Sequence, residues 1–401
     1  MTIAANLATL PLVLSQFHLV APLSLFANLL AVPLVALLAL PVGLLGLLFC
    51  WSPLLSGLCF TFSGYVLQTT LFVVAKLLDV PGFAAHYLFL SRWQYLAIAL
   101  LVLPLICLGA ERRIRRKFPQ ILILCCAVAF SCGAANHSEQ AEVTAYMLSV
   151  GQGESILLVD SDKYALLIDG GGLYSDRFDV GKRLLAPAFG ELGVRRLDAV
   201  LLSHDHPDHR KGLKFILQHF PVAQFWTSLD REDLHPDLQD VLHDKEIGVR
   251  TFSAGWTAVD MAGFGELQLF SAPDKKNKND SSLVLYLATA DGGLLLTGDL
   301  EKRGVNRLLR SGLPGPVSLL KLPHHGSRHS ATEKLIDALR PDVCVVSAGY
   351  QNRYRFPANQ LLDYLHLVQI PLYRTDTMGT IRARAVSGRW RLDRWRDPLF
   401  R

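Results

Sequence analysis

Apolar residues are concentrated before about residue 135 of this 401-residue chain, and this uneven distribution limits the fold more than any other feature. Hydrophobic residues make up 51% of the whole chain and charged residues only 19%. The apolar runs of the first third are longer than those of core helices in soluble proteins, whereas the remainder resembles an ordinary soluble domain. The sequence therefore predicts a multi-pass α-helical membrane region over residues 1–135 and a separate domain over residues 142–395.

Four apolar stretches are candidate membrane spans: 19–49, 54–78, 95–109 and 120–135. The first is longer than one span needs and contains prolines, so we expect one broken helix or two segments. Five basic residues crowd Arg112–Lys117, which favours the cytoplasmic side. The last stretch would then carry the chain outward, which predicts an inner-membrane protein whose second domain is extracytoplasmic.

Composition excludes little else. The net charge of +5 is compatible with an anionic partner but does not demonstrate one. Seven cysteines are present without a Cys-x-x-Cys pair, so we expect neither a disulfide framework nor a thiolate zinc site.

From Glu142 onward, short strands alternate with helices. Strands are expected at 143–150, 155–159, 165–169, 197–203, 266–271, 283–288, 294–297, 318–322 and 343–347, and helices at 183–192, 213–219, 300–310, 331–339 and 359–368. Strands that recur with helices between them predict a layered α/β architecture.

One segment of this domain, Ser203-His204-Asp205-His206-Pro207-Asp208-His209, is rich in metal ligands and directly follows an apolar run. Imidazole and carboxylate together suit zinc or manganese. His204 and His206 would share one side of an extended segment and bind one ion, while Asp208 and His209 would bend toward a second. We therefore predict two divalent metal ions, which commonly hydrolyse phosphate esters. A polar loop with clustered histidines is the alternative.

Further candidate ligands follow other strands. Asp299 could bridge the two ions or, alternatively, cap the next helix. His324 or His325 could complete the second ion, and the other could hydrogen-bond a ligand or contact substrate. Asp169 could orient His206 or another ligand from behind, or it could be an ordinary turn aspartate.

The segment after these histidines predicts an anion site. Ser330-Ala-Thr-Glu333 has the spacing of a capping box, so a helix should begin there. Helix N-termini attract anions, and a substrate phosphate could bind near Ser327, Arg328 and His329. Plain exposed surface is an equal alternative for these residues.

Together these residues resemble known families. Asp169, His204-x-His206-x-Asp208-His209, Asp299 and His324-His325 resemble the ordered motifs of the metallo-beta-lactamase superfamily. The chain also resembles the C-terminal part of the ComEC family of DNA-internalisation competence proteins. The segments that carry this resemblance are Phe26-Ala-Asn28-Leu-Leu-Ala-Val-Pro33-Leu-Val, Leu148-Ser-Val-Gly151-Gln152-Gly153-Glu154-Ser155 and Leu322-Pro-His324-His325-Gly326-Ser327. The resemblance implies a four-layer αββα sandwich with metals at the edge of its two sheets.

The resemblance also implies roles for the ligands. His204 and His206 would bind the first metal, Asp208 and His209 the second, Asp299 would bridge, and His325 (or His324) would complete the second site. Asp208 and Asp299 would hold the ions and accept hydrogen bonds from the attacking water, which would hydrolyse an ester, amide or phosphodiester.

In the ComEC family, the membrane part is understood to pass one DNA strand inward, and the metallo domain is proposed to degrade the other. DNA, bound through its backbone, is thus the implied partner. The alternatives are a DNA-conducting transporter with a catalytically weak metal-binding domain, or a membrane-tethered hydrolase of another phosphodiester. Membrane lipid, other competence proteins and a second copy of the chain are further candidate partners.

Several departures from the family pattern matter. No histidine occurs at 275–282, so Asn279 or Asp280 would substitute for it or support a ligand from behind. Ser149 replaces an aspartate, and Arg210-Lys211-Gly212 replaces a glycine-rich run and adds positive charge.

The family usually has a further soluble domain and more spans, so this chain is compatible with a fragment, a split gene or a degenerate copy. Residues that could follow phosphates, or form an ordinary cationic surface, are Lys275–Lys278, Arg353, Arg355, Arg382 and Arg384.

Overall fold

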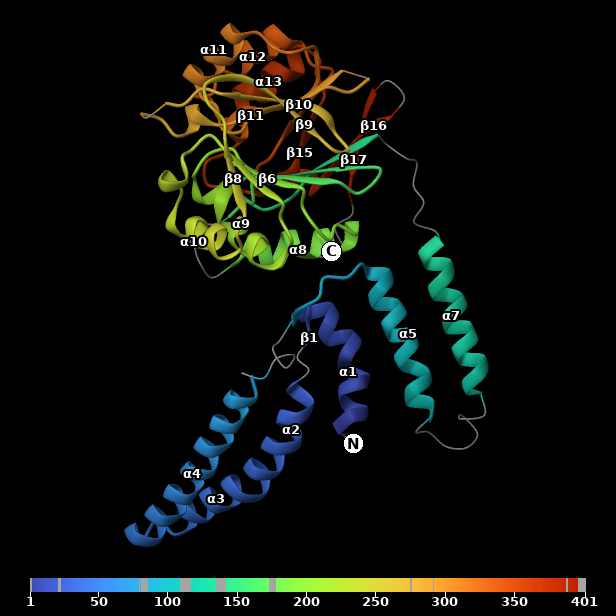
Figure 1. Cartoon of the computed structure of the whole chain (residues 1–401), viewed down its shortest axis with the longest axis vertical. Helices are drawn as coiled ribbons and strands as arrows, with labels where there is room; N and C mark the ends of the chain where they lie inside the picture. The colour runs from blue at the N-terminus through green and yellow to red at the C-terminus, as the bar shows by residue number, and fades with distance from the viewer. Residues whose placement is uncertain are drawn as a thin grey trace. The chain divides into compact units, whose positions relative to one another are not determined.

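The computed structural model describes residues 2–20, 23–78, 80, 86–108, 117–134, 142–172, 178–274, 276–290, 292–386 and 389–395. They form two compact units, Met1–Asn136 and His137–Arg401. The first unit consists mainly of helices, and the second contains two large sheets with helices (Figure 1).

Apolar helices build the first unit. They are α1 (Thr2–Phe17), α2 (Leu23–Pro33), α3 (Leu40–Leu48), α4 (Pro53–Leu78), α5 (Arg92–Leu108) and α7 (Phe118–Ala134). Within the described part of the chain, two helical stretches, Phe26–Leu48 and Pro53–Leu77, are long and apolar enough to cross a membrane. The predicted spans at 95–109 and 120–135 correspond to α5 and α7, which have 17 residues each and are at the short limit for spanning a bilayer. Apolar N-terminal helices that could span a membrane are thus confirmed.

The first predicted apolar stretch differs from expectation in two places. Leu19–Val20 is not helical but forms a short strand, β1, which pairs antiparallel with β2 (His86–Tyr87). The helix that follows is not broken at its prolines. A π-helical segment, η1 (Leu34–Ala39), joins α2 to α3 instead, and the N–H of Leu40 donates to the carbonyl of Val35, five residues back. A π-turn absorbs local irregularity within a continuous helix. Gly109 and Arg112–Arg116 lie outside the described residues.

Two mixed sheets form the centre of the second unit. The eight-stranded sheet has the order β17-β16-β3-β4-β5-β6-β7-β8. Its strands are β3 (Val143–Met147), β4 (Ile156–Asp160), β5 (Ala165–Ile168), β6 (Ala199–Leu202), β7 (Gln224–Thr227), β8 (Gly248–Thr251), β16 (Ile381–Val386) and β17 (Arg389–Arg394). The seven-stranded sheet has the order β15-β14-β13-β12-β11-β10-β9. Its strands are β9 (Gly255–Met261), β10 (Gly265–Ser271), β11 (Val284–Leu287), β12 (Gly293–Leu296), β13 (Val317–Lys321), β14 (Val343–Val346) and β15 (Leu372–Arg374).

The two sheets pack face to face around one apolar core. Ile156 and Leu201 of the eight-stranded sheet belong to the same buried cluster as Leu269 and Leu296 of the other. A second buried cluster lies between the seven-stranded sheet and α11 (Lys302–Ser311), α12 (Thr332–Leu339) and α13 (Asn359–Leu367). A second group of helices lies on the opposite side of the two sheets in Figure 1. It consists of α8 (Ala186–Leu192), which follows the π-helical η2 (Gly181–Leu185), α9 (Pro207–His219) and α10 (Pro236–Asp244). The predicted αββα sandwich is confirmed.

The direction of the parallel strands places the candidate site residues at one edge of each sheet. β5 and β6 run parallel in one sheet, and β12 and β13 run parallel in the other. Asp169, Ser203 and Asp299 follow the carboxyl ends of β5, β6 and β12, and the two adjacent histidines follow β13. Carboxyl ends of neighbouring parallel strands lie at the same edge of a sheet, which is the usual place for a site in such folds.

Candidate metal centre

The first histidine motif changes from extended chain to helix within its own length. His206 has β-region dihedral angles, and α9 begins at Pro207 rather than at the expected residue 213. Proline suits the first helical position because its φ is preset and its missing N–H would be unpaired there anyway. Gly172 packs against this turn with φ +152°, and a Cβ there would lie 2.2 Å from the carbonyl oxygen of Pro207. Asp208 and His209 therefore occupy the first helical turn.

Asp169 fixes the orientation of His209. It lies fully buried, and its Oδ2 accepts a hydrogen bond from His209 Nδ1 at 2.7 Å. The same carboxylate accepts from the backbone N–H of Ser203 at 2.8 Å and from the Ser203 hydroxyl at 2.6 Å. Because a carboxylate only accepts, Nδ1 of His209 carries the proton and Nε2 faces the opposite way. The aspartate therefore supports His209 rather than His206.

His325 is oriented in the same manner. Its Nδ1 donates to the carbonyl oxygen of Ser347 at 2.8 Å, and the side chain is buried. Its Nε2 lies 3.3 Å from Asp299 Oδ2, as does Nε2 of His209. A hydrogen bond from the far ring nitrogen to a carboxylate or carbonyl is the usual support of a metal-binding histidine.

The atoms around Asp299 require a cation. Among the described residues, Nε2 of His209 and of His325 and Oδ1 of Asp299 are buried without a hydrogen-bond partner. With each Nδ1 donating elsewhere, the neutral rings would direct two lone pairs at a carboxylate, which is unfavourable unless a proton or a metal ion lies between them. Three overlapping groups of potential ligands occur here: His204, His209 and Asp299; Asp208, His209 and His325; and Glu154, Asp299 and His325. The donor set fits divalent metal ions of the zinc or manganese type.

Electrostatics in the cluster lead to the same conclusion. Burial disfavours the charged form of His209, yet the carboxylates of Asp299 and Asp169 raise its pKa well above the ordinary value. Burial likewise opposes ionisation of Asp299, but His325 and His209 hold the pKa of its carboxyl well below the usual range. Without a metal ion, these shifts favour a proton on His209 beside an ionised Asp299. A bound metal ion would replace that proton as the positive charge.

His204 and His206 are brought together. His204 Nε2 lies 3.1 Å from His206 Nδ1, close enough for both nitrogens to face one ion. Burial lowers the pKa of both imidazoles and so favours the neutral, ligand-competent form.

The two adjacent histidines after β13 differ. His324 keeps 19% of its side chain exposed, with Nδ1 3.4 Å from Glu301 Oε1 and Nε2 3.9 Å from Asp299 Oδ2. Only 1% of the His325 side chain is exposed, and Nε2 also lies 3.8 Å from Asp208 Oδ2. The geometry therefore favours His325 as the ligand and leaves His324 facing Glu301.

Asn279 and Asp280 lie in a short 3₁₀ turn, η4 (Asn279–Ser281), and bond to the start of α11. Oδ1 of Asp280 accepts from the backbone N–H groups of Glu301 and Gly304, at 3.0 and 2.6 Å, and so caps this helix from another segment. Asn279 Nδ2 donates to Glu301 Oε1 at 2.9 Å. Neither residue belongs to the three ligand groups. Asp299 does not cap α11 either, because the N-cap position is Glu301.

A buried ion pair beside the ligands was not foreseen. Lys321 and Glu154 are both fully buried and bonded to each other. Lys321 Nζ also donates to the carbonyl oxygen of Gly298 at 3.1 Å and lies 3.9 Å from Asp299 Oδ1. A lysine at the end of an apolar strand, three residues before the first of the two histidines, is the signal that could have revealed the pair, because a buried charge needs a partner.

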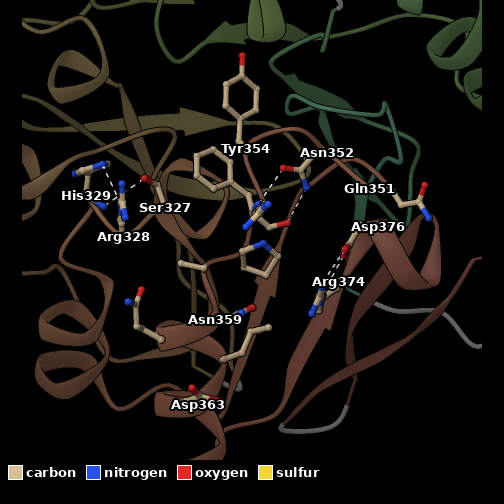
Figure 2. A pocket seen from close by; sticks show the side chains of 16 residues that line it. Ser327, Arg328, His329, Gln351, Asn352, Tyr354, Asn359, Asp363, Arg374 and Asp376 are labelled. Atoms are coloured by element: carbon tan, nitrogen blue, oxygen red, sulfur yellow. Dashed lines mark hydrogen bonds and ion pairs between the residues drawn. The ribbon is translucent and has the colours of Figure 1, made fainter.

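Ser327, Arg328 and His329 line a cleft of 1220 Å³ (Figure 2). The predicted capping box beside them is wrong. Ser330 donates its hydroxyl to the carbonyl of Ser327, and α12 has Ala331, with φ 48°, at its N-cap without a side-chain hydrogen bond. Because α12 begins at Thr332, the serine lies one residue too early to cap it.

Three of the other predicted basic residues form ion pairs within the protein. Arg210 pairs with Asp205 at 2.7 Å, and Arg382 and Arg384 both pair with Asp393. Two arginines follow β14: Arg353, which lies over the Tyr354 ring, and Arg355, which lines the cleft. Lys275 lies outside the described residues.

Comparison with known proteins agrees with this architecture. The model of the metallo-beta-lactamase superfamily matches residues 149–350, and the competence protein model matches residues 1–112. ComE operon protein 3 of Bacillus subtilis (strain 168) is 28% identical over 408 residues, which cover 96% of this chain and 51% of that protein. Competence protein ComA of Neisseria gonorrhoeae is 27% identical over 386 residues, covering 94% and 50%. The chain spans about half the length of these curated relatives.

Among solved structures, a diphosphatase of the PhnP family aligns with 58% of this chain and 94% of its own, at 15% identity and a TM-score of 0.35. The family match is decisive because it covers half of the chain and every proposed ligand. The chain belongs to the metallo-beta-lactamase superfamily, whose members are metal-dependent hydrolases, and joins that domain to a competence-protein region as in the ComEC family.

Proposed function

We propose that the second unit is a dinuclear-metal hydrolase that cleaves DNA phosphodiester bonds, and that the chain acts in DNA uptake by degrading the strand that is not transported. The observation that carries the metal-dependent chemistry is the convergence of two buried, unpartnered imidazole nitrogens on Asp299. The match of residues 1–112 to a competence family supports DNA as the substrate.

The proposed ligands would serve two ions, manganese or zinc. His204 and His206 would hold the first, Asp208, His209 and His325 would hold the second, and Asp299 would be shared by both, which is supported by the 3.3 Å distances from its Oδ2 to Nε2 of His209 and of His325. Bound ions would polarise the phosphodiester and make water a better nucleophile.

The protein's own side chains position the reactants. Asp169 and the Ser347 carbonyl keep two imidazoles turned inward, so little reorganisation is needed on loading. Asp208 keeps 18% of its side chain exposed and is placed to accept a hydrogen bond from the attacking water. Arg328, His329 and Ser327 line the adjoining cleft, where the DNA backbone would run.

A metal-addition experiment tests the hydrolase. The full chain, purified in detergent and stripped of metal, should leave single- and double-stranded DNA intact. Adding manganese or zinc should start cleavage, and a chelator should stop it. Metal binding without cleavage of either DNA would favour a DNA-conducting role or another ester substrate. A chain that binds no metal would refute the ligand assignment.

We also propose that the chain resides in the inner membrane with its second unit on the extracytoplasmic side. The basic run Arg112–Lys117 precedes the last apolar helix and favours the cytoplasm by the positive-inside rule. External protease added to cells stripped to an intact inner membrane should therefore digest a C-terminal tag, while a cytoplasmic control protein survives. Protection of the tag until the membrane is dissolved would reverse the orientation.

A further inference from the structure

A layered stack of side chains leads from the metal centre to the surface. Phe356 lies against both adjacent histidines, with ring centroids 5.8 Å from His324 and 6.3 Å from His325. Tyr354 stacks on Phe356 at 5.5 Å with an interplanar angle of 18°, and the guanidinium of Arg353 lies 4.8 Å from the Tyr354 centroid. Tyr354 is 42% exposed although it is a large aromatic residue. We call Arg353, Tyr354 and Phe356 the stacking ladder.

The loop that carries the ladder is fixed before any ligand arrives. Asn352 Nδ2 donates to the carbonyls of Gly349 and Phe356, at 3.0 and 2.7 Å, and its Oδ1 accepts from the Phe356 N–H at 2.9 Å. Gln351 and Arg355 have φ values of 48° and 58°, a region that such residues rarely adopt. Strained backbone held by several hydrogen bonds is characteristic of functional loops, and a preformed loop loses little entropy on binding.

The cleft beside the ladder suits a polyanion that carries planar groups. Tyr354 and the exposed Arg328 line it (Figure 2). Phe356 and the exposed Arg355 belong to the same lining. Arg374, also in the lining, is neutralised by Asp376, to which its Nε donates at 3.0 Å. Asp363 also lines the cleft, so three arginines and two aspartates leave it one formal positive charge. Aromatic stacking surface combined with cationic side chains is the usual way in which proteins bind single-stranded nucleic acid.

We propose that the stacking ladder holds an unpaired nucleobase of single-stranded DNA, so that the adjoining phosphates pass Arg328 and Arg355 toward the metal centre. The base would add to the outer end of the ladder, against Tyr354 and the Arg353 guanidinium, since both aromatic rings and guanidinium planes stack bases. A base within a duplex is already stacked on its neighbours, so the ladder selects single strands. This proposal rests on the proposed function, because it names how the DNA substrate is gripped.

Binding to the metal-stripped full chain, where no cleavage occurs, tests the ladder. Fluorescence anisotropy would compare a labelled oligothymidylate with an abasic oligonucleotide of equal length. Tyr354→Leu should weaken binding of the oligothymidylate by about tenfold or more, the loss expected for one stacked base, and should leave abasic binding unchanged. Tyr354→Trp should restore it.

Tyr350 supplies the matched control. It lies in the same loop and is 76% exposed, yet it does not line the cleft. Tyr350→Leu should bind the oligothymidylate like the unmodified chain. Thermal unfolding should be unchanged in both leucine variants because both side chains are exposed.

Three results would overturn the ladder: unaltered binding by Tyr354→Leu, an equal loss for the abasic chain, or an equal loss in Tyr350→Leu. Failure of the hydrolase is a separate outcome. A chain with Tyr354-dependent binding that never cuts DNA with manganese or zinc retains the ladder and refutes the nuclease. A chain that cuts DNA but binds it independently of Tyr354 retains the nuclease and refutes the ladder.

Discussion

Replacing His209 with alanine is expected to abolish metal-dependent cleavage, with a loss of roughly a thousandfold or more, because metal ions supply several kcal/mol of transition-state stabilisation. His209 belongs to two of the three overlapping ligand groups. Its Nε2 lies 3.3 Å from the proposed bridging carboxylate, and its Nδ1 is held by Asp169. Its loss should therefore remove a ligand of the second ion and a contact to the carboxylate that both ions would share.

Bound metal per chain, measured by elemental analysis after dialysis, is the readout that separates a lost ligand from a misfolded domain. His209→Ala should lose metal while retaining the helical and sheet signal of the unmodified chain. His243→Ala is the matched control, because that histidine lies exposed near the end of α10 and outside the ligand groups. Full metal content and full activity in His209→Ala would exclude the assignment.

Local chemistry explains why the metal motif is visible in the sequence. One short segment contains four of the proposed ligands, His204, His206, Asp208 and His209. Local geometry, an extended stretch followed by the first turn of a helix, brings their side chains close together. Apolar runs predict the inner strands equally well, since β5 and β6 are buried along their whole length. The order of sheets and the αββα layering follow from the resemblance to a family rather than from these patterns.

Contacts between distant segments were less predictable. Asp169 was expected to support His206 or another ligand, and the choice of His209 depends on the helix beginning at Pro207. Asp280 caps a helix that begins more than twenty residues later. Such pairings are set by tertiary packing, which a single sequence does not encode in any readable periodicity.

Strands with mixed polarity were missed for a related reason. β16 alternates buried and partly buried residues but carries Arg382 and Arg384, which pair with Asp393 on β17. Read alone, these arginines suggest a nucleic-acid surface, whereas the hairpin uses them to join two strands. Charged residues on a strand's outer face therefore obscured both the element and its role.

Replacing Glu154 with glutamine is expected to lower the free energy of unfolding of the second unit by about 3–5 kcal/mol, the cost of leaving one buried charge unpaired. Glu154 and Lys321 are both fully buried. Burial lowers the pKa of Lys321 well below its ordinary value, because apolar surroundings disfavour the charged amine. Lys321→Met should be costly for the same reason. Denaturant titration of the metal-free full chain would measure both, because metal binding would otherwise add to stability.

The exposed pair Lys214–Asp237 provides a matched control, with a 2.8 Å separation and 46% of each side chain exposed. Asp237→Asn should cost less than about 1 kcal/mol. The double variant Glu154→Gln, Lys321→Met should recover much of the lost stability, because no unpaired charge remains buried. Equal stability of Glu154→Gln and the unmodified chain would show that the pair carries no charge in the folded state.

If the double variant is stable but binds metal poorly, the pair is kept for the charge beside Asp299, since Lys321 Nζ lies only 3.9 Å from its Oδ1. Stability and metal affinity would then be separate demands on the same two residues.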